Sequence, residues 1–98
     1  MRLEWSDLAI EQATALAHFI ARDDAAAARK WVDVLFVKAQ RLADYPQSGR
    51  VVPEIKRADI REIMYGDYRI VYRVEPARVA ILTVRHGARK LDADDLDI

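Results

Sequence analysis

The chain has 98 residues, a common length for one domain and long enough to form a core without a metal or a disulfide. It contains no cysteine, which excludes a disulfide framework, a thiolate nucleophile and a cysteine zinc site. Its formal net charge is zero. No apolar run approaches the length of a membrane span and the N-terminus lacks a signal peptide's apolar core, so we expect a soluble, cytoplasmic protein.

The first half of the chain predicts a short strand and then a helical hairpin. Residues 2–6 alternate loosely between polar and apolar side chains, which indicates a strand. Apolar residues then recur at helical spacing from Ala9 to Ile20 and again from Ala28 to Leu42. Ser6-Asp7 and Asp23-Asp24 offer side chains that cap helix N-termini. We therefore expect a helical hairpin over residues 7–44, followed by a loop at 46–57.

The second half predicts three consecutive strands at about 60–65, 68–75 and 78–86, rich in Ile, Val and Tyr. Gly66-Asp67 and Pro76-Ala77 lie where hairpin turns are expected, so residues 59–87 form a meander. An acidic tail, residues 91–98, completes the chain. The predicted fold class is α+β in the order β-α-α-β-β-β, with the helical hairpin packed on a mostly antiparallel sheet in a single domain, 1–98.

A two-residue turn at Gly66-Asp67 determines which side chains share a face of the sheet, because successive strand residues point to opposite faces. The face expected beneath the helices carries Tyr68, Ile70, Tyr72 and Val74. On the other face Glu62 lies diagonal to both Arg69 and Arg73, and we expect that face to be open to solvent.

The charges are unevenly distributed. Residues 50–90 carry ten bases and five acids, whereas the last eight residues carry four aspartates. The basic stretch predicts a surface for an acidic partner or a phosphate, screened in part by the tail; the alternative is a solvated surface of mixed charge.

Four segments resemble the RelE/ParE toxin family in order and spacing, and the resemblance extends over about residues 3–91. They are Pro53-Glu54, Ile60-Arg61-Glu62-Ile63, Tyr68-Arg69-Ile70-Val71-Tyr72-Arg73-Val74 and Ile81-Leu82-Thr83-Val84-Arg85-His86-Gly87-Ala88-Arg89. The resemblance implies the toxin of a type II toxin–antitoxin pair. RelE-like members cleave messenger RNA on the ribosome, ParE-like members inhibit DNA gyrase, and a non-toxic relative would act only as a binding module.

Cleavage of RNA needs a base, cations on the phosphate and an acid for the leaving oxygen. The candidates are Glu62 as base, Arg69 and Arg89 as phosphate ligands, and His86 as acid. Arg69 and Arg89 match basic catalytic positions of RelE-like toxins. For Arg69 the alternative is a charge cluster with Glu62 on an exposed face, and for His86 it is an ordinary residue at a strand end.

Three features favour the gyrase inhibitor. The tail lacks the tyrosine that several RelE-like enzymes place there, a net charge of zero forfeits part of the attraction to RNA, and the long hairpin resembles the ParE branch. No cofactor and no metal are expected, since the two histidines are far apart in the chain.

The resemblance also implies a cognate antitoxin whose C-terminal segment wraps the helices and adds a strand to the sheet edge. An acidic antitoxin would suit the basic stretch, and exposed aromatic residues of the hairpin would supply an apolar groove. The residues expected to bind target or antitoxin are Arg50, Arg61, Arg73, Arg85, Phe19 and Phe36. These aromatic residues could instead simply fill the far edge of the hairpin.

Overall fold

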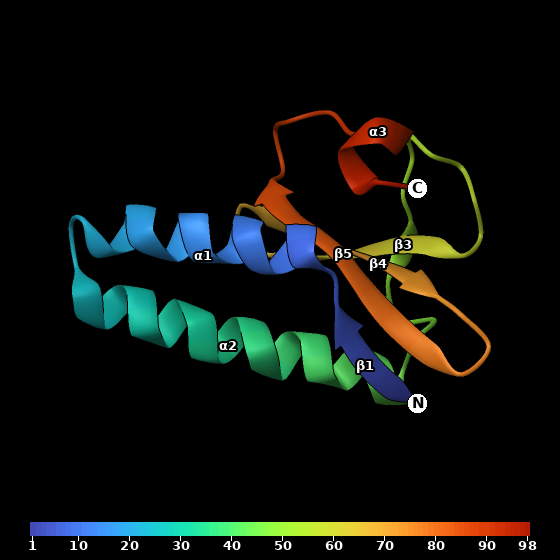
Figure 1. Ribbon diagram of the computed structural model, residues 1–98, viewed down its shortest axis with the longest axis horizontal. Helices are drawn as coiled ribbons and strands as arrows, with labels where there is room; N and C mark the ends of the chain where they lie inside the picture. The colour runs from blue at the N-terminus through green and yellow to red at the C-terminus, as the bar shows by residue number, and fades with distance from the viewer.

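The computed structural model describes all residues, 1–98, and shows helices on both faces of a five-stranded sheet (Figure 1). The predicted order of the elements is confirmed, with two additions, β2 and α3. The elements are β1 (Arg2–Trp5), α1 (Asp7–Ala21), α2 (Ala25–Asp44), β2 (Arg50–Val51), β3 (Ile60–Tyr65), β4 (Tyr68–Val74), β5 (Arg78–His86) and α3 (Ala93–Leu96).

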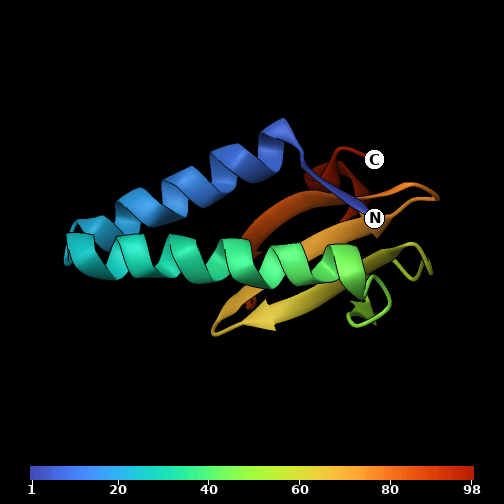
Figure 2. The ribbon, with the colours of Figure 1, turned by 90° about the horizontal axis from the view of Figure 1, so that it is seen from below.

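The helical hairpin begins at the predicted caps. The Ser6 side chain accepts a hydrogen bond from the Ala9 N–H, and the Asp24 side chain accepts one from the Ala27 N–H. Such caps satisfy amide groups that the first turn of a helix leaves unpaired. The tip of the hairpin extends well beyond the sheet in both views (Figures 1 and 2). None of the helices combines the length and the apolar composition that crossing a bilayer requires.

The sheet has the order β1-β5-β4-β3-β2. Only β1 and β5 are parallel, so the sheet is mostly antiparallel, as predicted. The predicted register of β3 and β4 is confirmed, since Tyr65 pairs with Tyr68 and Glu62 pairs with Val71. The two-residue turn at Gly66-Asp67 is therefore also confirmed.

The segment 46–57, predicted as a loop, contains the short strand β2, which pairs Arg50 with Glu62. Gly49 makes this approach possible, because a Cβ there would lie 2.5 Å from both the Glu62 carbonyl oxygen and the Tyr72 hydroxyl. The Gly49 N–H instead donates to that hydroxyl at 2.9 Å. The expectation of a plain loop missed β2 because this contact is tertiary.

One core lies between the sheet and the hairpin, as predicted. Trp31, Leu35 and Leu42 of α2 pack there against Ile70 and Tyr72 of β4. The ring of Trp31 stacks on that of Tyr65 with a centroid separation of 5.7 Å. The periodic apolar residues of both helices therefore point toward the sheet, as their spacing in the sequence predicts.

The opposite face carries a second core, and the expectation of an open polar face is wrong. The C-terminal segment, residues 88–98, folds back over this face, and Leu91 and Leu96 pack there against Val52, Ile60 and Val71. A reciprocal capping box between Asp92 and Asp95 begins α3. The acidic tail is thus an ordered layer of the fold, visible at the top of Figure 1.

A register shift in β5 helps to join this layer to the sheet. Val71 pairs with Thr83 whereas Tyr72 pairs with Ile81, which leaves Leu82 as an extra residue on β5. The shift reverses the alternation of side chains beyond it, so Arg85 lies on the face of the C-terminal segment. There the Arg85 guanidinium contacts the Asp95 carboxylate at 3.1 Å.

Candidate functional site

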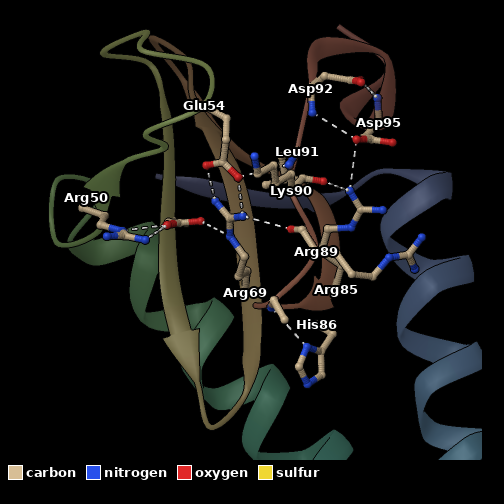
Figure 3. A network of polar contacts seen from close by, with 12 residues as sticks. Arg50, Glu54, Arg69, Arg85, His86, Arg89, Lys90, Leu91, Asp92 and Asp95 are labelled. Carbon is tan, nitrogen blue, oxygen red and sulfur yellow. Dashed lines mark hydrogen bonds and ion pairs between the residues drawn. The ribbon is translucent and has the colours of Figure 1, made fainter.

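Two guanidinium and two carboxylate groups meet on the face of the sheet opposite the helical hairpin, and we call this partly buried group the charge cluster (Figure 3). Its members are Arg50, Glu54, Glu62 and Arg69. Arg69 Nε donates to Glu62 Oε1 at 2.6 Å, and its Nη1 and Nη2 donate to the two Glu54 oxygens at 2.7 and 2.9 Å. Arg50 reaches the other Glu62 oxygen at 2.6 to 2.7 Å.

Arg69 and Glu62 are 4% and 1% exposed. Arg69 also donates to the Arg89 carbonyl at 3.3 Å, so four of its five N–H groups have acceptors within the protein. The hydrogen bonds that Arg69 donates to Glu54, opposed by burial, raise the pKa of Arg69 above its usual value. The reciprocal bonds from Arg69 lower the pKa of Glu54 from 4.5 to about 2. Each charge is therefore satisfied by its neighbours.

The members of the charge cluster come from four parts of the chain: β2, the loop after it, β3 and β4. Glu62 and Arg69 lie on one face of β3 and β4 because their register places them diagonally. Glu54 approaches from the loop after β2, and its Oε2 also accepts from the Leu91 N–H at 3.1 Å. Glu54 and Arg69 consequently hold the C-terminal segment against the sheet.

The two other candidates for RNA chemistry take no part in the charge cluster through their side chains. His86 is exposed at the end of β5, where its Nδ1 accepts from the Ala88 N–H at 3.1 Å. Its ring lies apart from the guanidinium groups in Figure 3. Arg89 contributes only its carbonyl oxygen to Arg69, and its guanidinium forms no ion pair. The four predicted catalytic groups therefore do not surround a common open site.

The predicted binding arginines are dispersed over the sheet and mostly paired. Arg73 contacts Asp59 at 3.4 Å, and Arg85 contacts Asp95. Arg61 donates to the carbonyls of Gly49 and Ala58 and forms no ion pair. The basic stretch is thus largely neutralised by carboxylates of its own chain, which net charge along the sequence does not reveal.

An apolar groove runs between α1 and α2, and we call it the hairpin groove. One pocket of about 380 Å³ has seven hydrophobic residues among the nine that line it, including Trp5, Ile10 and Phe36. A second pocket of about 400 Å³ continues it towards the tip and shares Ala17, His18 and Val32 with the first. Phe36 is 53% exposed at its rim, whereas Phe19, also exposed, does not line it.

Sequence reasoning missed Glu54 as a member of the charge cluster and missed the role of the tail. Glu54 carries no local signal, since the groups that bond to it, on Arg69 and Leu91, are 15 and 37 residues away along the chain. The tail does carry one, because Asp92 and Asp95 have the spacing of a capping box ahead of Leu96. No group of three or more residues is arranged to hold a metal ion.

A helical hairpin with an apolar groove, set on a five-stranded sheet, defines a small α+β protein. A sequence model described as the ParE toxin of the type II toxin–antitoxin system parDE matches residues 3–91. The chain belongs to this toxin family.

Two individual proteins illustrate the relationship. The chain is 33% identical over 86 residues to "Toxin RelE2" of Caulobacter vibrioides, which covers 87% of this chain and 93% of that protein. It is similar in fold to a solved structure named "Chromosomal ParDE TA system from P. aeruginosa", with a TM-score of 0.73 and 19% identity. That match covers 88% of this chain and 95% of the other.

Proposed function

We propose that this toxin arrests growth by binding DNA gyrase, as ParE-like toxins do, and that it does not cut RNA. The observation that carries the proposal is the saturation of Arg69 and Glu62 by each other and by Glu54 and Arg50. A phosphate ligand needs free donors, and a general base needs access to the proton that it removes.

Releasing Arg69 for an RNA phosphate would not repair the site. It would leave the carboxylates of Glu54 and Glu62 without their main counter-charge, and carboxylates repel a phosphate. It would also detach the C-terminal segment, since Glu54 and Arg69 both bond to that segment. The charge cluster therefore supports a structural role for the residues that a nuclease would use.

RNA cleavage remains the second candidate, favoured by the name of the Caulobacter vibrioides relative. His86 and Arg89 are its strongest remaining residues, because neither is tied up in the charge cluster through its side chain. A relative without toxicity, acting only as a binding module, is the third reading, and soluble, folded protein that leaves growth unaffected would support it.

The first two readings are separated by one pair of assays on one variant. His86→Ala/Arg89→Ala should leave the fold intact, because both side chains lie outside the two cores. We expect the wild type and this variant to inhibit supercoiling by purified gyrase equally. Primer extension on translated messages should show no new cuts. Cuts within codons that disappear in the double variant, together with undisturbed supercoiling, would establish the nuclease instead.

The hairpin groove is proposed as the seat of the cognate antitoxin, which would insert an amphipathic helix between α1 and α2. Its length and apolar lining fit such a helix, and the absence of cysteine suits a complex that forms in the cytoplasm.

Phe36→Glu should abolish rescue by the antitoxin in a growth assay while leaving arrest intact, since a carboxylate would have to be buried at the interface. Phe19→Glu makes the same change outside the groove and should have a smaller effect. Full rescue of the Phe36 variant would show that the antitoxin does not bind in this groove.

A further inference from the structure

We propose that a third pocket, outside the hairpin groove and on a different face of α2, binds a carboxylate of an extended acidic segment of the same antitoxin. The inference rests on the proposed binding of the antitoxin and assigns the chemistry of a second contact. The pocket has a volume of about 270 Å³ and lies between the C-terminal half of α2 and β3. Its lining consists of Lys38, Arg41, Leu42, Tyr45, Ser48 and Ile63. We call it the basic pocket.

The cations of the basic pocket lack carboxylate partners. Every ion pair in the protein is formed by other bases, so Lys38 and Arg41 stand unpaired, and no acid lines the pocket. The Lys38 ammonium is placed 5.5 Å from the centre of the Tyr65 ring, a cation–π contact. Arg61, also unpaired, bonds to the carbonyl of Gly49, which follows Ser48 of the lining.

This arrangement differs from that of most arginines in the sheet. Arg50, Arg69, Arg73 and Arg85 each have a carboxylate of the same chain. The basic pocket is therefore a concave site whose positive charge has no counter-charge within the chain and would attract an external anion. Leu42 and Ile63 add apolar surface to it, which suits a side chain on a peptide better than a free inorganic anion.

The backbone beside the pocket favours an extended partner. β2 pairs only with Arg61 and Glu62 of β3, so residues 63–65 have a neighbouring strand on the β4 side alone. Ile63 lines the pocket at this free edge. A peptide lying there can bond to the strand edge while it places a carboxylate between Lys38 and Arg41.

Continuity with the hairpin groove assigns the pocket to the antitoxin. Phe36 lines the groove, Lys38 lines the basic pocket, and Val37 between them in sequence is 61% exposed. At about 100° per residue, Val37 lies on the outer surface of α2 between the faces that carry Phe36 and Arg41. An antitoxin that leaves the groove can thus cross α2 over exposed apolar surface and reach the pocket.

The test compares two charge reversals of equal size. Lys38→Glu/Arg41→Glu changes the basic pocket, and Arg22→Glu/Lys30→Glu changes two exposed, unpaired bases near the hairpin tip. The probe is a purified antitoxin that rescues the growth of cells producing the toxin, titrated at low and at high salt. We expect the first variant to lose affinity on the order of tenfold at low salt and to show a flatter salt dependence. The second should bind nearly as the wild type does.

Two further measurements define the outcomes. Growth arrest by Lys38→Glu/Arg41→Glu without antitoxin should persist; loss of arrest in a folded variant would overturn the inference and assign the pocket to the target. Equal loss of affinity in both variants would overturn it as well, because the effect would then follow net charge. Wild-type affinity of the pocket variant, with binding still lost in Phe36→Glu, would refute the basic pocket alone. Failure of the wild type to bind would refute the antitoxin proposal.

Arg41 also lies in the last turn of α2, where a cation stabilises a helix by interacting with its dipole. Thermal unfolding of both variants controls for this role. A weakened affinity that accompanies an unchanged melting temperature supports the pocket, whereas weakening that only follows a lowered melting temperature contradicts it.

Discussion

Arg69 shows how a residue that suits a catalytic role can be committed to structure. Its position suggested a phosphate-binding arginine through the resemblance to RelE-like toxins, but two carboxylates and a carbonyl of its own chain accept hydrogen bonds from it. A buried charge of this kind stabilises a fold mainly by satisfying its partners, because losing one member leaves the others uncompensated.

Arg69→Ala should therefore lower the free energy of unfolding by about 3–5 kcal/mol. Arg73, four residues further along β4 and on the same face, provides the matched control, since its side chain is partly exposed and contacts Asp59 at 3.4 Å. Arg73→Ala should cost less than about 1 kcal/mol. Denaturant titration measures the free energy of unfolding of each variant. Similar decreases in the two variants would show that the charge cluster stabilises the fold no more than a surface ion pair does.

Glu54 makes the stability of the protein depend on pH in the acid range. Its pKa is about 2 in the folded protein against an ordinary 4.5, so the unfolded chain takes up the proton first. The stabilisation is complete above pH 4.5 and is lost as the pH falls towards 2. Glu54→Gln should be less stable at neutral pH and should lose less stability between pH 4.5 and 2. Parallel pH profiles for wild type and variant would contradict this assignment.

At the scale of elements, the C-terminal segment behaves as a structural layer. Leu91 and Leu96 fill the core opposite the helices, and the capping box of α3 and the Arg85–Asp95 pair fix their approach. Of the four tail aspartates, Asp92 and Asp95 thus have partners within the protein.

Leu96→Ala should destabilise the protein by about 2–5 kcal/mol, because it leaves a cavity against the sheet. Ile98→Ala, two residues later at an exposed position, should change stability by less than about 0.5 kcal/mol. Thermal or denaturant unfolding distinguishes them. A tail that contributes nothing would give the two variants equal stability.

For the whole molecule, two cores share one sheet. Tyr72 belongs to the helix-side core, and its neighbour Val71 belongs to the core under the C-terminal segment. Neither core can keep its packing once β4 is lost, so the two should unfold together.

We expect one cooperative transition for residues 1–98, in agreement with the prediction of a single domain. Tryptophan fluorescence follows the helix-side core through Trp31, and exchange of the Leu91 amide, which is bonded to Glu54, follows the other. Coincident transitions support one domain. Exchange of Leu91 at much lower denaturant than the change at Trp31 would separate the two layers.

Much of the fold was predictable because local patterns encode it. The spacing of Trp31, Leu35 and Leu42 defines the buried face of α2, and the turn at Gly66-Asp67 sets the register of β3 and β4. The candidate site was less predictable. Glu62 and Arg69 were placed as neighbours, but their burial depends on Glu54 and Leu91, which come from distant parts of the chain.

The sequence by itself determined the main helices and strands, the pairing of the central strands and the family, because apolar periodicity, caps and turns act between residues close along the chain. Only the tertiary structure decided that the C-terminal segment closes over the sheet and bonds to Arg69, and that Lys38 and Arg41 face a pocket without a counter-charge. The physical reason is that a charge is free or satisfied according to what folds next to it, and the number of charges in a segment does not specify those neighbours.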